Sequence, residues 1–442
     1  MQRPLKILFV AGFFPPYAPP GAVRNPKLAE YLAAAGHEVQ VLSIQEQAHA
    51  GLHESVLPDA HVHSLPYAEP GEAVTRIVRA VKRISGTARA TDRDTAADGK
   101  AGAAPARGPG PSPLKLLYRQ AVALPDRYRS WVRAAVRRGR ILARTWMPDV
   151  ILSSGPPQSA HIAAARLSRA LGCPWVAELR DLWANNPYVD VHPLLRGAFE
   201  AKARATLGHA RAMVALTRTA QAELQATYDV PVLLATNGYD PADFEGLQDI
   251  ARPEADAGRL TIIHAGVIYP GRRDPRALFE AINRLDADKA RIRVRFFHDE
   301  LDFVGRLARE LDVQGCVEIR AAVPRREILR IERESDVLLL CRWANPADDG
   351  VIPGKVFEYI GARRPILSIG STSGEAAEIV RAGPFGLVSN DPDEIAAQLR
   401  AWLDQIEAEG RIPDLSADAA RPFERAAQFR KIETLLDEVV RG

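Results

Sequence analysis

Short apolar runs alternate with helix-patterned stretches along most of the 442-residue chain, and this alternation restricts the fold more than any other feature of the sequence. The first run, LKILFVAGFF (5–14), is apolar throughout, which is typical of a strand buried on both faces of a sheet. Asn25 and Pro26 then predict the N-cap and first turn of a helix that ends at Gly36. Because a second strand, EVQVLSI (38–44), follows at once, this part of the chain predicts a βαβ unit and a parallel sheet.

The alternation runs through two series, which predict two doubly wound, Rossmann-like α/β domains. In the first series we expect further strands at 149–154, 174–180, 212–216 and 230–238, and helices over 160–171, 195–207 and 220–227. In the second we expect strands at 260–266, 291–299, 316–323, 336–342, 365–370 and 385–389, and helices over 275–285, 304–311, 325–334, 355–362 and 374–382. We expect a first domain over 1–243, a linker over 244–258, a second domain over 259–425 and a C-terminal helix over 426–442. This last helix can pack either on the second domain or back on the first. Ligands bind at the carboxyl ends of strands in such sheets, so two domains facing across a cleft are expected.

The first domain also contains two unusual segments. Residues 86–113 are rich in Gly, Ala, Pro and Asp and lack apolar periodicity, which predicts a disordered insertion. The basic segment 115–146 carries nine Lys and Arg residues and one acid, Asp126, within a stretch 1–150 that holds 21 basic and 12 acidic residues. Such a segment can rest on anionic lipid or on a polyanion. The alternative is a solvated helix whose Arg side chains cover apolar neighbours.

The composition is typical of a soluble globular protein, with 47% apolar and 26% charged residues. No apolar run is long enough to cross a bilayer, and no signal peptide is indicated. Three widely spaced cysteines, Cys173, Cys316 and Cys341, form neither a disulfide framework nor a zinc pattern, which favours a reducing compartment. We therefore expect a cytoplasmic protein. Whether it also contacts the inner face of the membrane as a peripheral protein is left open.

The most informative polar motif lies between two strands of the second series. Pro353-Gly354-Lys355 predicts a helix N-terminus on the ligand side of the sheet, where backbone N–H groups and the helix dipole attract an anion. Glu358, one turn later on the same face as Lys355, suits the hydroxyl groups of a ribose. The alternative is an ordinary Lys–Glu pair on the surface of a helix.

A second set of candidates follows the first strand of the same domain, in HAGVIYPGRRDP (264–275). Gly266 permits a tight turn, and Arg272 and Arg273 present guanidinium groups that suit a diphosphate. The alternative is a basic turn that faces solvent. His264 can reach the same place, although a lone histidine in an apolar strand is more often structural.

The first domain offers two further pairs of candidates. Gly21 allows a close backbone approach after the first strand, and Arg24 adds charge near a helix start, but there is no G-x-G-x-x-G for a dinucleotide. Arg180 and Asp181 follow a strand directly and either orient an acceptor hydroxyl, as a catalytic pair, or tie two loops together. We expect no metal and no cofactor, because no metal-binding motif stands at a strand end. The charge of a departing diphosphate would then be neutralised by Lys, Arg and backbone dipoles.

Together, in this order and spacing, these stretches resemble family-4 glycosyltransferases of the GT-B fold. The likeness covers nearly the whole chain outside 86–113. It is carried by the opening Pro-Pro pair, Gly21, Arg24, Leu28-Ala29, Leu32, Gly36-His37-Glu38-Val39, Asn237-Gly238-Tyr239-Asp240, Phe244, Pro353-Gly354-Lys355 and Phe357-Glu358-Tyr359.

The resemblance implies a retaining, metal-independent, hexosyltransferase-type enzyme that moves a sugar from a UDP-, GDP- or ADP-sugar to an acceptor hydroxyl. It implies that Gly21 approaches the donor diphosphate, that Arg272 or Arg273 and Lys355 bind it, and that Glu358 holds the ribose. Members of this variant commonly build surface polysaccharides or modify lipid-linked or small-molecule acceptors, which leaves the acceptor open.

Three positions depart from the family pattern. The acid expected eight residues before Glu358 is replaced by Gly350, with Asp349 beside it. Val267 stands where the family has an arginine, and Ser153-Ser154-Gly155 stands where the first domain has a histidine. Two alternatives therefore stay open on the same fold: a nucleotide-sugar epimerase, and a non-catalytic partner protein, which Gly350 makes plausible.

Overall fold

The computed structural model describes most of the chain, namely residues 3–17, 23–46, 57–70, 113–186, 189, 191–247, 250, 252–299 and 301–442. The insertion expected over 86–113 lies, except for Pro113, outside these residues, and so does Gly21. The chain divides into two compact units. The N-terminal unit comprises 1–216, 220–235 and 431–442, and the C-terminal unit comprises 217–219 and 236–430.

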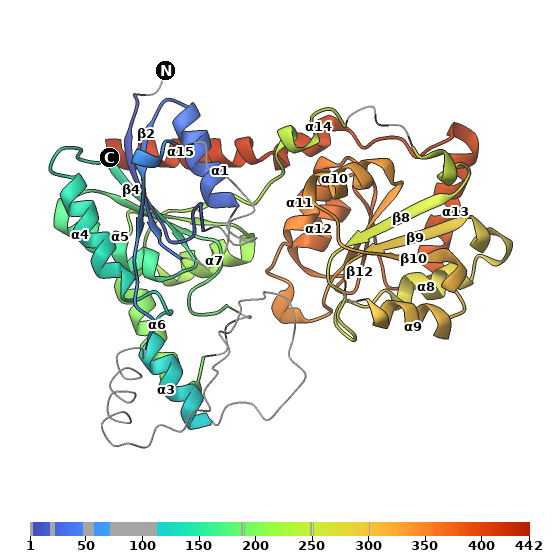
Figure 1. Cartoon of the computed structure of the whole chain (residues 1–442), viewed down its shortest axis with the longest axis horizontal. Helices are drawn as coiled ribbons and strands as arrows, with labels where there is room; N and C mark the ends of the chain where they lie inside the picture. Colours follow the sequence, from blue (N-terminus) through green and yellow to red (C-terminus); the bar gives the residue numbers. More distant parts are fainter. Residues whose placement is uncertain are drawn as a thin grey trace, which may run out of the picture. The chain divides into compact units, whose positions relative to one another are not determined.

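The N-terminal unit is built on a seven-stranded parallel sheet in the order β3-β2-β1-β4-β5-β6-β7 (Figure 1). Its strands are β1 (Lys6–Ala11), β2 (Glu38–Ile44), β3 (Val62–Leu65), β4 (Val150–Gly155), β5 (Trp175–Leu179), β6 (Ala212–Ala215) and β7 (Val232–Leu234). The helices of this part of the chain are α1 (Arg24–Ala34), α3 (Pro113–Ala123), α4 (Trp131–Leu142), α5 (Ser159–Leu171), α6 (Pro193–Leu207) and α7 (Arg218–Thr227). The strand order reverses between β1 and β4, so the carboxyl ends of these two strands open a crevice where ligands bind in folds of this kind.

The C-terminal unit repeats the plan with a six-stranded parallel sheet in the order β10-β9-β8-β11-β12-β13. Its strands are β8 (Leu260–Ala265), β9 (Ile292–Phe297), β10 (Val317–Arg320), β11 (Val337–Cys341), β12 (Ile366–Ile369) and β13 (Gly386–Val388). Its helices are α8 (Arg276–Asn283), α9 (Asp302–Glu310), α10 (Arg325–Glu334), α11 (Gly354–Gly361), α12 (Gly374–Ala382), α13 (Pro392–Glu409) and α14 (Ala417–Ala420). The prediction of two doubly wound, Rossmann-like domains is confirmed. That their ligand edges face one another stays a prediction.

Local structure differs from expectation at the start of the chain. Helix α1 begins at Arg24, so Asn25 is not the N-cap but lies inside the first turn, where its Nδ2 donates a hydrogen bond to the Phe13 carbonyl (2.8 Å). Strand β3 was not predicted, because VHSL is short and half polar. It joins the sheet beside β2, where the Ser43 and Ser64 hydroxyls lie 3.1 Å apart.

The C-terminal segment of the chain contacts both units. The backbone of Tyr239 pairs with it, since its N–H donates to Phe423 (3.1 Å) and its carbonyl accepts from Arg425 (2.7 Å). A side chain at Gly238 would meet the Phe423 carbonyl at 2.6 Å, so this close approach requires glycine. Helix α15 (Arg425–Arg441) belongs to the N-terminal unit from Lys431 onward, and there Glu433 accepts a hydrogen bond from the Tyr31 hydroxyl (2.8 Å).

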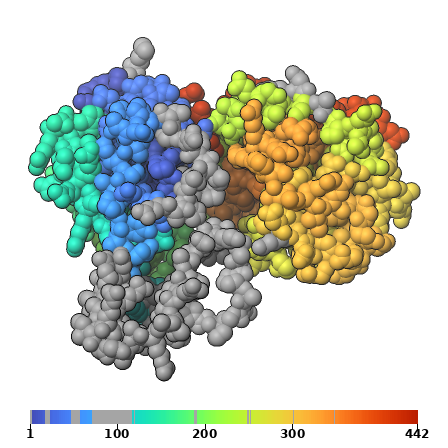
Figure 2. Space-filling model, in the orientation of Figure 1, coloured from blue at the N-terminus to red at the C-terminus, as the bar shows by residue number. Residues whose placement is uncertain are grey.

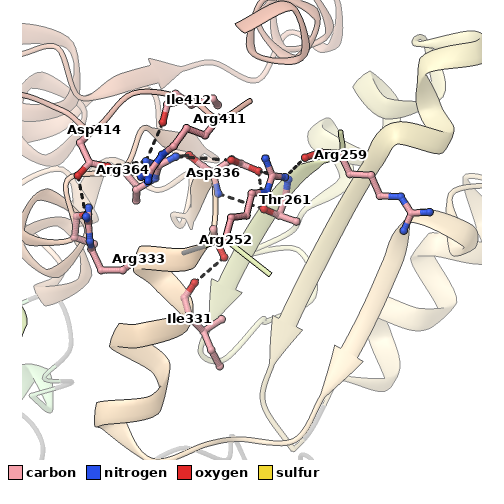
Figure 3. Close-up of polar contacts among 12 residues, drawn as sticks. Arg252, Arg259, Thr261, Ile331, Arg333, Asp336, Arg364, Arg411, Ile412 and Asp414 are labelled. Atoms are coloured by element: carbon pink, nitrogen blue, oxygen red, sulfur yellow. Dashed lines mark hydrogen bonds and ion pairs between the residues drawn. The ribbon is translucent and has the colours of Figure 1, made fainter. Parts of the chain in front are cut away.

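A cluster of charged side chains ties the linker of the C-terminal unit to its sheet (Figure 3). Arg252, in the linker, pairs with Asp336 (2.7 Å), which also accepts hydrogen bonds from the backbone and hydroxyl of Thr261 at the start of β8. On the other side of the cluster, Asp414 accepts hydrogen bonds from Arg333 and Arg364, both at 2.8 Å. Both arginines are buried, and the ion pairs with these carboxylates offset the free-energy cost of removing each guanidinium group from water.

We expect Asp414→Asn to destabilise the C-terminal unit by about 3 kcal/mol, because it removes the counter-charge of buried Arg333 and leaves buried Arg364 with the more distant Asp336 (3.8 Å). Urea unfolding measures this loss. Asp418→Asn is the control: it removes a comparable ion pair at the surface, to Arg421, and should change stability by less than about 1 kcal/mol. Equal effects of the two substitutions would contradict the role of the cluster.

The same carboxylate predicts a pH dependence. Burial alone would raise the pKa of Asp414, but the hydrogen bonds and charges of Arg333 and Arg364 outweigh it and hold the pKa below its usual value. A depressed pKa means that this stabilisation is present at neutral pH and is lost as the pH falls through the folded-state value. The difference in stability between wild type and Asp414→Asn should therefore shrink on acidification.

Candidate functional site

The side chain of Lys355 lies against the backbone of Gly266, at the edge of the C-terminal sheet where the strands end. A Cβ atom at Gly266 would stand 3.1 Å from Cε and 3.9 Å from Nζ of Lys355. Gly266 follows β8 directly and has a φ of +141°, a conformation that favours glycine. Lys355 is the second residue of α11, whose N-cap, Pro353, supplies no side-chain acceptor to the first turn. The ammonium group and the helix N-terminus therefore occupy the same edge, as the sequence predicts.

His264, the penultimate residue of β8, is buried behind this contact. Its Nδ1 lies 2.9 Å from the Leu339 carbonyl, so Nδ1 carries the proton and Nε2 is left as an acceptor without a partner. Burial, and then the charge of Lys355, lower the pKa of His264 to about 4. The ring is therefore neutral at physiological pH, and it contributes an acceptor rather than a positive charge.

Arg272 and Arg273 extend the positive charge along the loop after β8. The Arg272 guanidinium lies 4.5 Å from the ring centroid of Trp343, which follows β11, and that of Arg273 lies 5.7 Å from Tyr269. Within the described part of the chain neither arginine forms an ion pair with a carboxylate. Arg273 is close enough to contribute to the lowered pKa of His264, which places it at the same strand ends as Lys355.

Glu358 lies one turn after Lys355 and is held from the side by a second helix. Its Oε2 accepts a hydrogen bond from Arg325 at the start of α10 (2.6 Å), and Arg325 also donates to Asp243 (2.9 Å). Its Oε1 lies 3.9 Å from the Lys355 ammonium, at the limit of an ion pair. One oxygen of this carboxylate is thus committed to Arg325, and the other is available to a ligand.

Glu332, on α10, is a fully buried carboxyl group beside Glu358. Neither of its oxygens has a hydrogen-bond partner in the structure. Burial, together with the negative charge of Glu358, raises its pKa well above the usual value, and Lys355 opposes this only in part. A neutral Glu332 has a proton to donate, and Glu358 is the adjacent acceptor. Glu332 was not among the residues predicted from the sequence.

The acid next to Gly350 has structural partners. Asp349 accepts hydrogen bonds from the hydroxyls of Ser371 (3.0 Å) and Ser373 (2.7 Å), in the loop between β12 and α12. A Cβ atom at Gly374 would meet the Asp349 carbonyl at 2.5 Å, so this turn is closely packed. Asp349 therefore fastens one loop to another at the ligand edge.

In the N-terminal unit, Arg24 is buried rather than exposed to a ligand. Its Nε bonds Oε1 of Glu178 on β5 (2.9 Å), and its Nη2 donates to the Ala235 carbonyl (3.0 Å). The other oxygen of Glu178 accepts from the Ser154 hydroxyl (2.7 Å). These bonds join the start of α1 to the ends of β4 and β5, and a role of Arg24 in donor binding stays a prediction.

Arg180 and Asp181 follow β5 at the same edge. Arg180 donates to the Pro156 carbonyl through Nη2 (3.0 Å) and to Gly155 through its backbone, so it ties the loops after β4 and β5 together. Asp181 has an exposed side chain. Partial removal of its carboxyl group from water raises its pKa, and the positive charge of Arg180 opposes this shift. Their catalytic role stays a prediction.

The sequence matches no protein-family model and no curated protein. Solved structures do match it. A glycosyltransferase from Rickettsia africae is 12% identical over 100% of both chains, with a TM-score of 0.57. Alr3699/HepE from Anabaena, in complex with UDP, is 14% identical over 98% of this chain and 100% of that one, with a TM-score of 0.60. A putative UDP-N-acetylglucosamine 2-epimerase from Listeria monocytogenes is 14% identical over 98% and 95%, with a TM-score of 0.51.

This chain has the GT-B fold. The strand ends that carry Lys355, Arg272 and Arg273 are thus the ligand edge of the second domain of a GT-B protein. Among the residues described here, no three His, Cys, Asp or Glu side chains gather in a way that would hold a metal ion. No helix in the same residues has the length and apolarity needed to span a bilayer.

Some residues beside the candidate positions were not predicted from the sequence. In the C-terminal unit, Trp343 lies against Arg272 and Arg325 against Glu358 through contacts between elements, which no local pattern encodes. His161, on α5, is fully buried with its Nδ1 2.8 Å from the Ser153 hydroxyl, and burial lowers its pKa to about 3. One signal was available: Glu178 is a charged residue inside an otherwise apolar strand, which implies a buried partner.

We expect Glu332→Gln to stabilise the protein above pH 7 and to leave it unchanged near pH 4. Because the folded-state pKa of Glu332 is raised, its neutral form is favoured in the fold, and stability is lost as rising pH forces ionisation. Glutamine cannot ionise, so the variant avoids a cost of about 1.4 kcal/mol for each unit by which the pKa is raised. Urea unfolding between pH 4 and pH 9 measures the difference.

Glu327→Gln, on the exposed side of the same helix, is the matched control and should show no such pH-dependent gain. A Glu332→Gln protein that is less stable than wild type at pH 8 would show that the carboxylate is ionised and stabilised in the fold.

Proposed function

We propose that this protein is a glycosyltransferase that moves a sugar from a nucleotide diphosphate sugar to an acceptor hydroxyl. The observation that carries the proposal is a group of three cations at one sheet edge. Arg272 and Arg273 pair with no carboxylate among the described residues, and Lys355, at the N-terminus of α11, lies 3.9 Å from Glu358. Cations and helix-end amides in one place fit a diphosphate.

The chemical need for these charges arises when the glycosidic bond to the donor breaks. The nucleoside diphosphate leaves with the bonding electron pair, and its added negative charge must be stabilised. Lys355 and Arg273 supply fixed positive charge, and Lys355 is held at Gly266 before a ligand arrives. Since a placed charge needs no reorganisation during the reaction, it favours the transition state over the bound donor.

The nucleoside fits the neighbouring side chains of the same unit. Oε1 of Glu358 is available to accept from a ribose hydroxyl, while Arg325 fixes the carboxylate through Oε2. UDP is the favoured nucleotide, because the similar Anabaena structure was determined with UDP and also with UDP-glucose. GDP and ADP are the other nucleotides to be tested for binding.

Several finer features belong to the proposal and rest on the resemblance to family-4 enzymes. They are retention at the anomeric carbon, independence of a metal or cofactor, a hexose as the sugar, and a role in surface polysaccharide or glycoconjugate synthesis. We place the enzyme in the cytoplasm, at the inner face of the membrane. Three free cysteines, all buried, fit a reducing compartment, and the basic segment 115–146 fits an anionic surface.

A second candidate function is a nucleotide-sugar epimerase. The similar structure from Listeria monocytogenes favours it, and so does the acid–base character of Glu332, Glu358 and His264 beside the donor cations. Product analysis without an acceptor separates the two: an epimerase converts the donor alone, whereas a transferase needs an acceptor. A non-catalytic partner protein, consistent with Gly350, would bind the donor without turnover.

The donor site is tested by thermal shift with UDP, GDP, ADP and dTDP. One nucleotide should raise the melting temperature, since a ligand at 100 times its Kd stabilises the fold by about 2.7 kcal/mol. Lys355→Ala should weaken binding of that nucleotide at least tenfold, because a charge-assisted hydrogen bond is lost. Arg306→Ala, which removes an exposed arginine of α9, is the control and should bind as wild type. Unchanged affinity in Lys355→Ala would overturn the assignment.

The first domain is tested by Asp181→Asn. If Asp181 orients or activates the acceptor hydroxyl, transfer should slow by about 100-fold or more while nucleotide affinity stays unchanged. Steady-state kinetics and titration of the nucleotide measure the two separately. A variant with full activity would leave Arg180 and Asp181 with the loop-tying role alone.

A further inference from the structure

Three adjoining hollows on the surface of the N-terminal unit are lined by cations and by no carboxylate. Their volumes are about 830, 410 and 250 Å³. The largest lies along α4 and the facing side of α5, and the other two share Arg166 and continue to α6. We call their cationic lining the basic trough; it consists of Arg129, Arg133, Arg137, Arg140, Arg144, Arg166, Arg169 and Lys202.

No side chain of the basic trough forms an ion pair within the described ranges, and its one hydrogen bond is a long one from Arg169 to the Ala205 carbonyl (3.4 Å). The contrast with nearby Arg127 is clear, because that arginine pairs with Glu46. Like charges gathered in one hollow repel each other, and no carboxylate among the lining residues relieves the repulsion. Such an arrangement fits an anionic partner.

The chain itself brings these cations together from three helices. Helix α4 lies at the surface of the unit (Figures 1 and 2, teal) and exposes the side on which Arg133, Arg137 and Arg140 stand. Arg166 comes from α5 and Lys202 from α6, outside the basic segment 115–146. The trough is therefore a feature of the folded unit and not of a charge run alone.

Apolar side chains in the same hollow distinguish between kinds of anionic partner. Ile141 and Met147 are 41% and 47% exposed, and both line the largest hollow. No aromatic side chain lines any of the three hollows, so a single-stranded nucleic acid would find no surface on which its bases stack. A lipid surface offers phosphates to the arginines and an apolar boundary to Ile141 and Met147.

We propose that the basic trough docks the protein on an anionic phospholipid bilayer, with its cations among the lipid phosphates and with Ile141 and Met147 in the headgroup region. This inference deepens the location within the proposed function and rests on it. Each Lys or Arg near an anionic surface raises membrane partitioning about fivefold. Reversing three of them should therefore lower partitioning by at least 100-fold.

The experiment is sedimentation with vesicles of phosphatidylcholine alone or with about 30% phosphatidylglycerol, an anionic content that gives a strongly negative surface. The wild type should bind only the anionic vesicles, and less as salt rises. The variant Arg137→Glu/Arg140→Glu/Arg144→Glu should lose this binding. The control Arg306→Glu/Arg309→Glu/Arg326→Glu makes the same change in net charge on exposed residues of the C-terminal unit and should keep it.

A second variant, Ile141→Ser/Met147→Ser, should lower the binding that survives at high salt. The proposal is overturned if the trough variant binds as wild type, if the control loses as much binding, or if neutral vesicles bind equally. It is also overturned if a single-stranded RNA oligonucleotide binds and anionic vesicles do not.

Nucleotide thermal shift on the same preparations separates this inference from the donor site. A trough variant that still responds to the nucleotide is folded, and its lost vesicle binding supports the trough. Vesicle binding by a wild type that responds to no nucleotide would count against the donor assignment and still support the trough.

Discussion

The close approach of Lys355 to Gly266 is the contact on which the donor site proposed for the C-terminal unit depends. It is possible because β8 and the strands that flank α11 run parallel, so that the loop after β8 and the first turn of α11 meet at one edge. Any side chain at residue 266 would strain the backbone, and its Cβ would crowd Cε of Lys355. The helix N-terminus, Arg273 and Glu358 then gather around a charge whose position is already set.

The arginines of this chain fall into two groups by their partners. Arg333 and Arg364 are buried, and each is matched by Asp414 in the cluster at the start of the C-terminal sheet. Arg272 and Arg273 stand at the opposite edge of that sheet, against aromatic rings, and neither pairs with a carboxylate in the part of the chain that the structure describes. Because leaving a charge unmatched is costly inside a protein and useful at a ligand site, the pairing pattern separates arginines that hold the fold from those available to bind.

Much of the fold was predictable, because period and apolarity are local properties of the sequence. Strand β11, buried on both faces, is an unbroken apolar run, β8 is apolar except for Thr261 and His264, and the helix start after Pro353 carries its own signal. The predictions of local structure that were wrong concern features that tertiary contacts decide. Asn25 looks like an N-cap but bonds Phe13 from within α1, and β3 forms only because β2 presents an edge to it.

The candidate site could likewise be predicted in part from the sequence. Lys355 and Arg273 could be placed at one edge, since parallel strands end together. The position of Glu332 beside Glu358 could not be predicted, because it depends on how α10 packs against α11. Arg24 shows the reverse case: its position near a helix start suggested a ligand, while its actual partner, Glu178, lies 154 residues further along the chain.

A crystal structure of the protein with the nucleotide that the thermal-shift panel selects tests the donor site most directly. We expect a pyrophosphate oxygen within about 3.2 Å of the Lys355 ammonium and of backbone N–H groups in the first turn of α11, with Arg273 alongside. A nucleotide bound elsewhere, or one whose pyrophosphate leaves Lys355 untouched, would contradict it.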